Sequence, residues 1–250
     1  MDTRYEQYKE AYQHIIDNCE RIVKTNISAI KKTRKKFLDI GCGSGGFIIH
    51  ANKCGYNAYG LEPIKKYAQI ARKNIGGGAM LAIGEGESLP FKTKFDIIAL
   101  NEVIEHVKDW KKVINESIAS LEKGGVLFIS TSNKQHPFTN EVNNFPFFPY
   151  LPEYFQHKFI GFCVKHRPDI INFTTLPVNN YFTHYELRKH LKSIHYNLIA
   201  YDEIELYNKE NLKSYKKILK PLWKMTTLPF IRFLLYFFVK STRLYVIKMD

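Results

Sequence analysis

Cysteine is scarce in this sequence of 250 residues, and its spacing is informative. The four cysteines form no C-x-x-C pair, and no neighbouring histidine stands at the spacing of a zinc ligand. This pattern argues against a disulfide scaffold and against a zinc site, so we expect no metal and a reduced, cytoplasmic protein. Low-complexity tracts are also lacking, and apolar residues make up 45% of the chain. A folded domain with a substantial core is therefore expected.

Long hydrophobic runs are missing as well. The chain begins with a polar, tyrosine-rich segment instead of a basic stub and an apolar core, so we expect no signal peptide. The apolar stretch 228–239 contains Arg232 and would extend only about 18 Å as a helix, whereas the hydrocarbon core of a bilayer is roughly 30 Å thick. Such a segment can lie at a membrane interface, or it can pack against its own domain or a second copy.

Acidic residues are too few to balance the basic ones, which leaves a formal net charge of +13. The segment 209–250 holds ten Lys and Arg against two Asp and Glu, and a second basic cluster occupies 31–36. These clusters can be solvated faces that favour solubility. They can equally attract an anionic membrane surface or nucleic acid, so charge alone leaves the partner open.

Segments typical of strands and helices alternate in the first half of the chain. We expect a leading helix or helix pair over 3–30. Strands are expected at 37–40, 58–61, 80–83, 95–100 and 126–131, and helices at 45–53, 64–74 and 109–121. The glycines at 124 and 125 are expected to cap the last of these helices in the left-handed conformation. This alternation predicts an α/β fold, a Rossmann-like doubly wound sheet that binds ligands at the carboxyl ends of its strands.

The alternation stops after residue 131. Residues 137–182 hold twelve Phe and Tyr, interleaved with prolines, so we interpret 132–182 as an insertion that covers the site. Its aromatic rings could line an apolar pocket or form a small core of their own. A capping box at 183–186 predicts a helix to about residue 194, and strands are expected at 198–204 and 244–249. Between these strands lies a basic and hydrophobic, helical segment, 209–240.

A single domain, 1–250, follows from this organisation. We divide it into an N-terminal helical segment, a cofactor-binding core, the insertion and a C-terminal part, with bounds 1–35, 36–131, 132–182 and 183–250.

The glycine-rich run at 37–47 is the most informative motif. An apolar strand ends in an acid, and a glycine turn then leads into a helix, so backbone N–H groups and the positive helix end can approach a nucleotide-like cofactor. Read literally, the glycines also fit the dinucleotide spacing G-x-G-x-x-G. Asp39 favours a cofactor with an ammonium group over a pyrophosphate. Glu62, at the end of the next strand, suits a ribose diol in either kind of cofactor.

Further blocks follow in order at 60–63, 84–91, 95–98, 102–107 and 121–125. With 38–45, they make the chain resemble the class I S-adenosylmethionine-dependent methyltransferases. The small-molecule branch with quinone-biosynthesis O-methyltransferases and enzymes of glycan or lipid modification looks most similar. The resemblance implies S-adenosylmethionine as cofactor, S-adenosylhomocysteine as product, and a seven-stranded, mostly parallel sheet whose last strand is antiparallel.

The resemblance also implies roles for individual residues. Cofactor contacts would come from Asp39, Gly41, Cys42, Gly43, Gly45, Glu62, Pro63, Glu85, Gly86, Glu87, Asn101 and Glu102. The family more often has Asp-Ala where this chain has Glu85 and Gly86, so Glu87 is an alternative partner for the adenine.

The acceptor side would be lined by the segment that contains Glu105 and His106. We expect these two as catalytic residues, with His106 as a general base, because an imidazole titrates near neutrality. A histidine that is simply packed beneath the insertion is the equal alternative. Candidate acceptor-binding residues in and beside the insertion are His136, Glu141, Tyr181 and His184, together with Asn144 and Thr183.

These observations predict methyl transfer, most simply to an oxygen of a small or lipid-linked acceptor such as a quinone, glycolipid or glycan precursor. The protein would be cytoplasmic, with a possible peripheral site at the inner face of a membrane. A nucleic-acid methyltransferase is less favoured, because 101–104 lacks the Asn/Asp-Pro-Pro-aromatic element of amino-methylating enzymes. A non-catalytic or NAD-binding protein of the same fold is the third alternative, and the sequence leaves the oligomeric state open.

Overall fold

A computed structural model describes most of the chain. The described residues are 3–27, 35–138, 142, 145–171, 178–202, 205–206, 228–236, 238–239 and 241–249. Most of the basic segment 209–240, and the centre of the basic cluster 31–36, lie outside these ranges.

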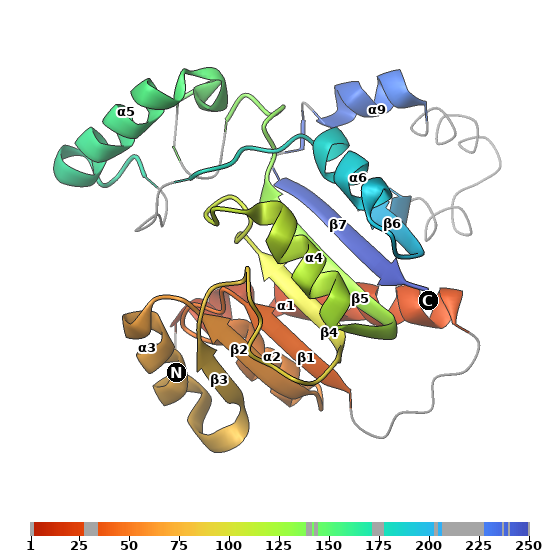
Figure 1. Ribbon diagram of the computed structural model, residues 1–250. Helices are drawn as coiled ribbons and strands as arrows, with labels where there is room; N and C mark the ends of the chain where they lie inside the picture. The colour runs from red at the N-terminus through yellow and green to blue at the C-terminus, as the bar shows by residue number, and fades with distance from the viewer. Residues whose placement is uncertain are drawn as a thin grey trace.

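A seven-stranded sheet forms the centre of the molecule (Figure 1). Its strands are β1 Lys36–Ile40, β2 Asn57–Glu62, β3 Met80–Ile83, β4 Phe95–Asn101, β5 Leu121–Ser132, β6 Leu198–Asp202 and β7 Ser241–Lys248. The strand order is β3-β2-β1-β4-β5-β7-β6, and only β7 runs antiparallel to its neighbours. The expected Rossmann-like sheet with an antiparallel last strand is thus confirmed. Its order reverses between β1 and β4, the place where such sheets bind ligands.

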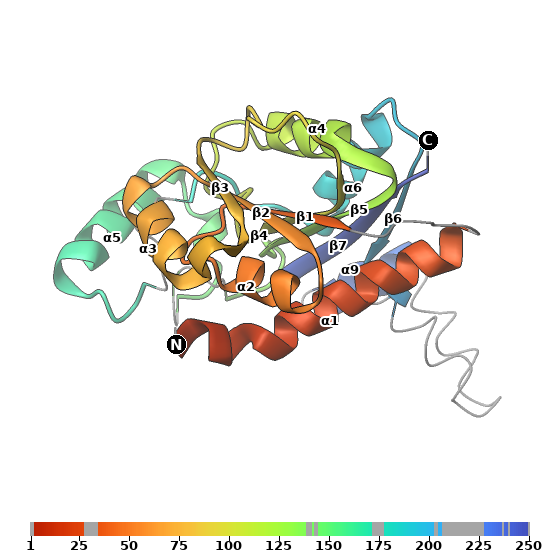
Figure 2. The same cartoon turned by 90° about the horizontal axis from the view of Figure 1, so that it is seen from below.

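Helices cover both faces of the sheet (Figure 2). They are α1 Thr3–Asn26, α2 Gly46–Lys53, α3 Lys65–Ile75, α4 Trp110–Ser120, α5 Glu153–His166, α6 His184–Ser193 and α9 Pro229–Tyr236. One face packs against α1 and α2, around large rings such as Phe37 and Phe128. The other packs against α4 and α6, around aliphatic side chains such as Leu38 and Ile98. Burial on both faces explains why the strands are almost continuously apolar.

The leading segment is one helix, α1, and it ends at Asn26. Its apolar side chains Ile15, Ile16 and Ile22 lie in the core beneath the sheet. No helix within the described ranges combines the length and the apolarity that crossing a bilayer requires.

The expected glycine cap of α4 is wrong. The helix ends at Ser120, and Leu121 is already extended (φ −74°, ψ 142°). Gly124 does adopt a left-handed φ of +78°, but within β5, close to where the register against β4 shifts between the Phe95 and Ile97 pairs. An added Cβ at Gly125 would come within 2.9 Å of the carbonyl oxygen of Phe95. The glycines therefore permit a bend within β5. This bend depends on the pairing of β5 with β4 and not on the end of α4.

The segment 132–182 builds a small unit at the edge of the sheet where the parallel strands end (Figure 1). It contains a short 3₁₀ turn, Phe148–Tyr150, and α5. Val142, Phe148 and Ile160 form a separate apolar cluster there, with Phe145, Phe159 and Tyr181 packed against it. Part of the aromatic content thus makes a core of the segment's own.

Candidate active site

The glycine turn after β1 is held open by backbone geometry. Gly41, Gly43 and Gly45 all have positive φ, of 71°, 52° and 84°. An added Cβ at Gly41 would approach Val103 to 2.6 Å, and one at Gly45 would approach Ile75 to 2.8 Å. A Cβ at Gly43 would meet nothing within 4 Å. Gly43 therefore borders open space, where a ligand can approach the backbone.

Glu62 links this turn to β2. Its buried carboxylate accepts a hydrogen bond from the backbone N–H of Gly43 at 2.9 Å and another from the N–H of Ile64 at 2.9 Å. Each carboxylate oxygen can accept a further hydrogen bond. Glu62 thus shapes the turn and keeps acceptor capacity for two hydroxyl groups, while Pro63 beside it is exposed.

Asp39 lies at the other side of the turn and is buried. Burial, and next the negative charge of Glu62, raise the pKa of the Asp39 carboxyl well above its ordinary value. A cationic ligand group placed here would offset both effects. Cys42 is buried next to these acids, and burial raises the pKa of its thiol, which makes it a poor nucleophile.

The loop after β3 presents two carboxylates in different settings. Glu85 is exposed and Gly86 is buried. Glu87 accepts hydrogen bonds from the backbone N–H groups of Lys108 and Asp109, at 3.2 and 3.3 Å, immediately before α4. Glu87 therefore braces the loop, and Glu85 is the carboxylate that is turned to solvent.

The end of β4 carries a strained residue. Glu102, which follows Asn101, has a left-handed φ of 56°, rare for a residue with a side chain. Its backbone N–H donates to the carbonyl oxygen of Ser130 at 2.9 Å, and the Ser130 hydroxyl donates to its carboxylate at 2.6 Å. Such a conformation costs about 1 to 3 kcal/mol and is typical of functional sites. Ser130 was not among the expected site residues; a polar residue inside an apolar strand was its only signal.

Two asparagines hold the turn that contains Glu105 and His106. The backbone N–H groups of Asn179 and Asn180 donate to the Glu105 carbonyl oxygen at 2.7 and 3.0 Å. The Asn179 side chain donates to the carbonyl oxygen of His106 at 2.8 Å, and that of Asn180 to Val107 at 2.9 Å. Glu105 is only 1% exposed, whereas His106 is partly exposed. The segment 178–182 thus fixes the expected acceptor-side turn, a role that the sequence did not reveal.

The expected acceptor-binding residues fall in separate places. The backbone N–H of Phe138 donates to Nδ1 of His136 at 3.0 Å. Tyr181 packs against the apolar cluster of the segment 132–182. Thr183 forms the expected capping box with Glu186 at the start of α6. Glu141 and Asn144 lie outside the described residues.

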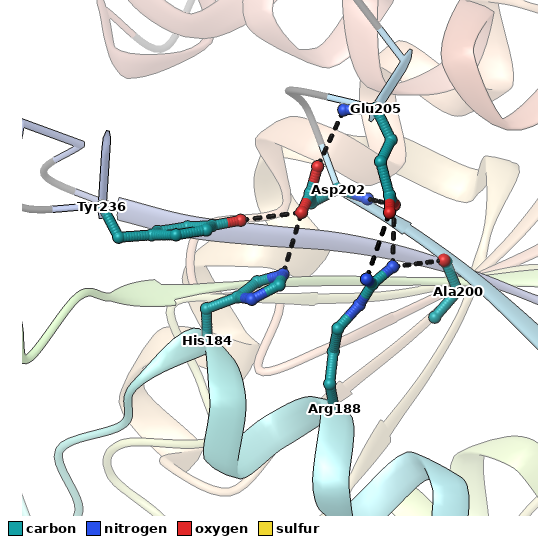
Figure 3. A network of polar contacts seen from close by, with 6 residues as sticks. All are labelled: His184, Arg188, Ala200, Asp202, Glu205 and Tyr236. Atoms are coloured by element: carbon teal, nitrogen blue, oxygen red, sulfur yellow. Dashed lines mark hydrogen bonds and ion pairs between the residues drawn. The ribbon is translucent and has the colours of Figure 1, made fainter. Parts of the chain in front are cut away.

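His184 belongs to a buried polar network between α6, β6 and α9 (Figure 3). Its Nε2 lies 2.9 Å from an Asp202 carboxylate oxygen, which also accepts a hydrogen bond from the Tyr236 hydroxyl at 2.9 Å. The rings of His184 and Tyr236 stack with centroids 4.3 Å apart. Asn133, directly after β5, donates from its side chain to the carbonyl oxygens of Tyr236 and Val239, both at 2.7 Å. The carboxyl end of α9 is therefore clamped at the edge of the sheet where the candidate site lies.

Across the ranges that the structure describes, no group of three or more His, Cys, Asp or Glu side chains is arranged to hold a metal ion.

Comparisons with known proteins agree with this geometry. A family described as a methyltransferase domain matches residues 8–217. An uncharacterized protein, MJ1123 of Methanocaldococcus jannaschii, is 34% identical over 128 residues, which are 50% of this chain and 59% of that protein. A ubiquinone biosynthesis O-methyltransferase of Pelagibacter ubique is 34% identical over 125 residues, 46% of this chain and 52% of the relative. The chain thus spans somewhat more than half the length of these relatives.

A solved structure extends the likeness to the whole fold. The S-adenosylmethionine-dependent methyltransferase of Clostridium acetobutylicum has 14% sequence identity and a TM-score of 0.57, covering 100% of this chain and 93% of that one. At this identity the match shows a shared fold.

Proposed function

The chain belongs to the methyltransferase-domain family, and from that membership we propose that it methylates a hydroxyl oxygen of a small, apolar acceptor. S-adenosylmethionine-dependent methyl transfer follows from the family and the fold. When bound, S-adenosylmethionine supplies an electrophilic methyl group on a sulfonium cation.

The observation that carries the cofactor assignment is the arrangement of Asp39, Gly43 and Glu62 around one turn. Glu62 has the acceptor capacity that a ribose diol needs, and Gly43 has no side chain to block approach. Asp39 is a buried acid that a ligand ammonium would stabilise in its ionised form. We assign the remaining cofactor contacts to Gly41, Cys42, Gly45, Pro63, Glu85, Gly86, Glu87, Asn101 and Glu102.

We assign to His106 the role of the general base that accepts the proton of the acceptor hydroxyl. It is partly exposed on a turn that Asn179 and Asn180 fix, whereas Glu105 is buried and better suited to hold the turn than to receive a proton. A fixed turn matters because methyl transfer requires in-line approach of the oxygen to the methyl carbon.

An apolar or lipid-linked acceptor at an anionic membrane surface is supported by α9 and its surroundings. Leu228, Phe230, Leu234 and Phe238 are exposed there, and the sequence around them is basic. Exposed apolar side chains beside basic residues suit the interface of an anionic bilayer. The name of the Pelagibacter ubique relative, a ubiquinone biosynthesis O-methyltransferase, supports oxygen as the methylated atom. The segment 132–182, with its candidates His136, Glu141 and Tyr181, would cover the acceptor, beside His184.

A methyl-transfer assay tests the proposal. S-adenosylmethionine with an isotope-labelled methyl group is incubated with phenols that carry or lack an isoprenoid tail, and with soluble sugars. We expect the label on a phenolic oxygen, transferred faster to the tailed phenol. Faster transfer of the label to the sugars would contradict the proposal.

The role of His106 is tested in the same assay. His106→Ala should lower kcat by a factor of about 100 to 10,000, the usual contribution of a general base. His195→Ala, at an exposed position on the loop after α6, is the matched control and should leave kcat unchanged. Equal rates for both variants would remove His106 from catalysis.

A further inference from the structure

Helix α5 has two faces of unusual character. One face buries Gln156, Ile160 and Cys163, and Ile160 belongs to the apolar cluster of the segment 132–182. The rest of the helix leaves Tyr154, Phe155 and Phe162 exposed by 61%, 57% and 56%. Large rings are normally withdrawn from water, so three of them on one helix mark an interaction surface.

The exposed rings continue onto the turn before the helix. Phe147 and Tyr150 are both more than half exposed, and their ring centroids lie 6.4 Å apart. The ring centroids of Tyr154 and Phe155 lie 5.5 Å apart. We call the set Phe147, Tyr150, Tyr154, Phe155 and Phe162 the aromatic face.

Cations accompany this face. The ammonium group of Lys158 lies 4.6 Å from the ring centre of Tyr154, and that of Lys134 lies 5.7 Å from the ring centre of Tyr150. Lys165 follows Phe162 on the same helix. Aromatic rings beside lysines are the combination that settles at the headgroup level of an anionic bilayer, since the rings enter the acyl boundary and the ammonium groups contact lipid phosphates.

We propose that the aromatic face of α5 docks onto an anionic membrane surface. A bilayer fits better than a second copy of this chain, because two copies of a protein with a net charge of +13 repel each other, whereas anionic lipid attracts them. Figure 1 shows α5 and α9 at the same edge of the sheet, and α9 with the residues beside it exposes Leu228, Phe230 and Phe238. Docking through α5 and α9 brings the carboxyl ends of the strands close to the lipid.

The docking helix is connected to the candidate site. The chain leaves α5 and returns through Asn179 and Asn180, which hold the turn at Glu105 and His106. This inference rests on the proposed function. Docking would give a lipid-linked acceptor a route to the turn at Glu105 and His106.

Vesicle co-sedimentation tests the docking. The full-length protein is mixed at low salt with vesicles of phosphatidylcholine, or of phosphatidylcholine with phosphatidylglycerol. We expect binding to the anionic vesicles, weakened about tenfold or more by Phe155→Ser with Phe162→Ser, because two rings no longer enter the lipid. The control pair, Met80→Ser with Ile83→Ser, removes exposed apolar side chains from β3, an outermost strand of the sheet, and should bind like the wild type.

Phe162→Trp gives a second readout. Because the wild type already has two tryptophans, the signal is the difference between the emission of the variant and that of the wild type; it should shift to the blue with anionic vesicles and stay unchanged with phosphatidylcholine alone. Equal vesicle binding by the serine pair and the wild type would overturn the proposal. A dimer in sedimentation velocity that the serine pair dissociates would also overturn it, since the face would then join two copies.

Calorimetry with S-adenosylhomocysteine on the same samples separates the two proposals. Loss of vesicle binding with intact cofactor binding by the serine pair supports the docking. A wild-type protein that binds vesicles through α5 but binds no S-adenosylhomocysteine would refute the proposed function and leave the docking surface standing.

Discussion

Asp39 makes the stability of the free protein depend on pH. Its pKa is higher in the folded chain than in the unfolded chain, so the folded state binds more protons between these two values. Stability contributed by this group is therefore present at acid pH and is lost as pH rises through the folded pKa. Asp39→Asn should remove this loss and make the cofactor-free protein more stable at neutral pH than the wild type.

Urea unfolding over a series of pH values measures this effect. The same substitution should weaken S-adenosylhomocysteine binding about tenfold, because a charged hydrogen-bond acceptor is lost. If the stability of the variant and that of the wild type fall in parallel with pH, the burial of the Asp39 charge is not the cause.

The glycine turn offers a matched pair of substitutions. Gly41→Ala places a methyl group against Val103 at a left-handed φ, so the strain and the clash together should cost about 2 to 5 kcal/mol of unfolding free energy. Gly43→Ala meets no neighbour and should cost only about 1 to 2 kcal/mol, from its left-handed φ.

Gly41→Ala should lose more unfolding free energy than Gly43→Ala, but Gly43→Ala should lose more cofactor affinity. Gly43→Ala adds a methyl group on the side where the ligand approaches, so its loss of S-adenosylhomocysteine affinity should exceed that of Gly41→Ala. Urea unfolding and calorimetry measure the two quantities. Unchanged cofactor affinity in Gly43→Ala would mean that the open space beside this residue is not the binding site.

Among the helices and strands, the polar network under α9 is expected to stabilise the fold. Tyr236→Phe removes the hydroxyl that donates to Asp202, which leaves a buried carboxylate with one partner fewer. The variant should lose about 1 to 3 kcal/mol of unfolding free energy. Tyr185→Phe, at an exposed position of α6, is the control and should be neutral. Equal unfolding free energies for both variants would show that the network does not stabilise the clamp on α9.

The elements also show what sequence alone can predict. Apolar runs bounded by glycine or acids located all seven strands, and the five inner strands are apolar because they are buried on both faces. The capping box located α6 through a purely local contact. The end of α4 was predicted incorrectly, because the conformation of Gly124 depends on the pairing between β4 and β5. That pairing is a long-range contact.

In the candidate site too, some contacts could be predicted from the sequence and others could not. Asp39, Gly43 and Glu62 could be expected to meet, since the carboxyl ends of adjacent parallel strands share an edge. The contacts of Ser130, Asn179 and Asn180 could not, because they join segments far apart in the chain and carry no local pattern.

On the scale of the whole molecule, the two ends of the sheet differ. The exposed rings of α5 and the exposed apolar side chains of α9 lie at the edge where the parallel strands end, which is also the edge of the candidate site. The positive charge of the chain adds a long-range attraction to anionic lipid, which salt weakens. This arrangement would place the proposed cofactor site, the proposed acceptor entry and the proposed docking surface at one edge of a single sheet.

We infer that the turn at Gly43 and the carboxylate of Glu62 hold S-adenosylmethionine. Isothermal titration calorimetry with S-adenosylhomocysteine and with NAD tests it on the wild type, on Glu62→Gln, and on Glu10→Gln as an exposed control on α1. The wild type and Glu10→Gln should bind S-adenosylhomocysteine equally and NAD not at all, and Glu62→Gln should bind about 10 to 100 times more weakly, as expected for the loss of a charged hydrogen-bond acceptor. Binding of NAD without binding of S-adenosylhomocysteine would contradict the account.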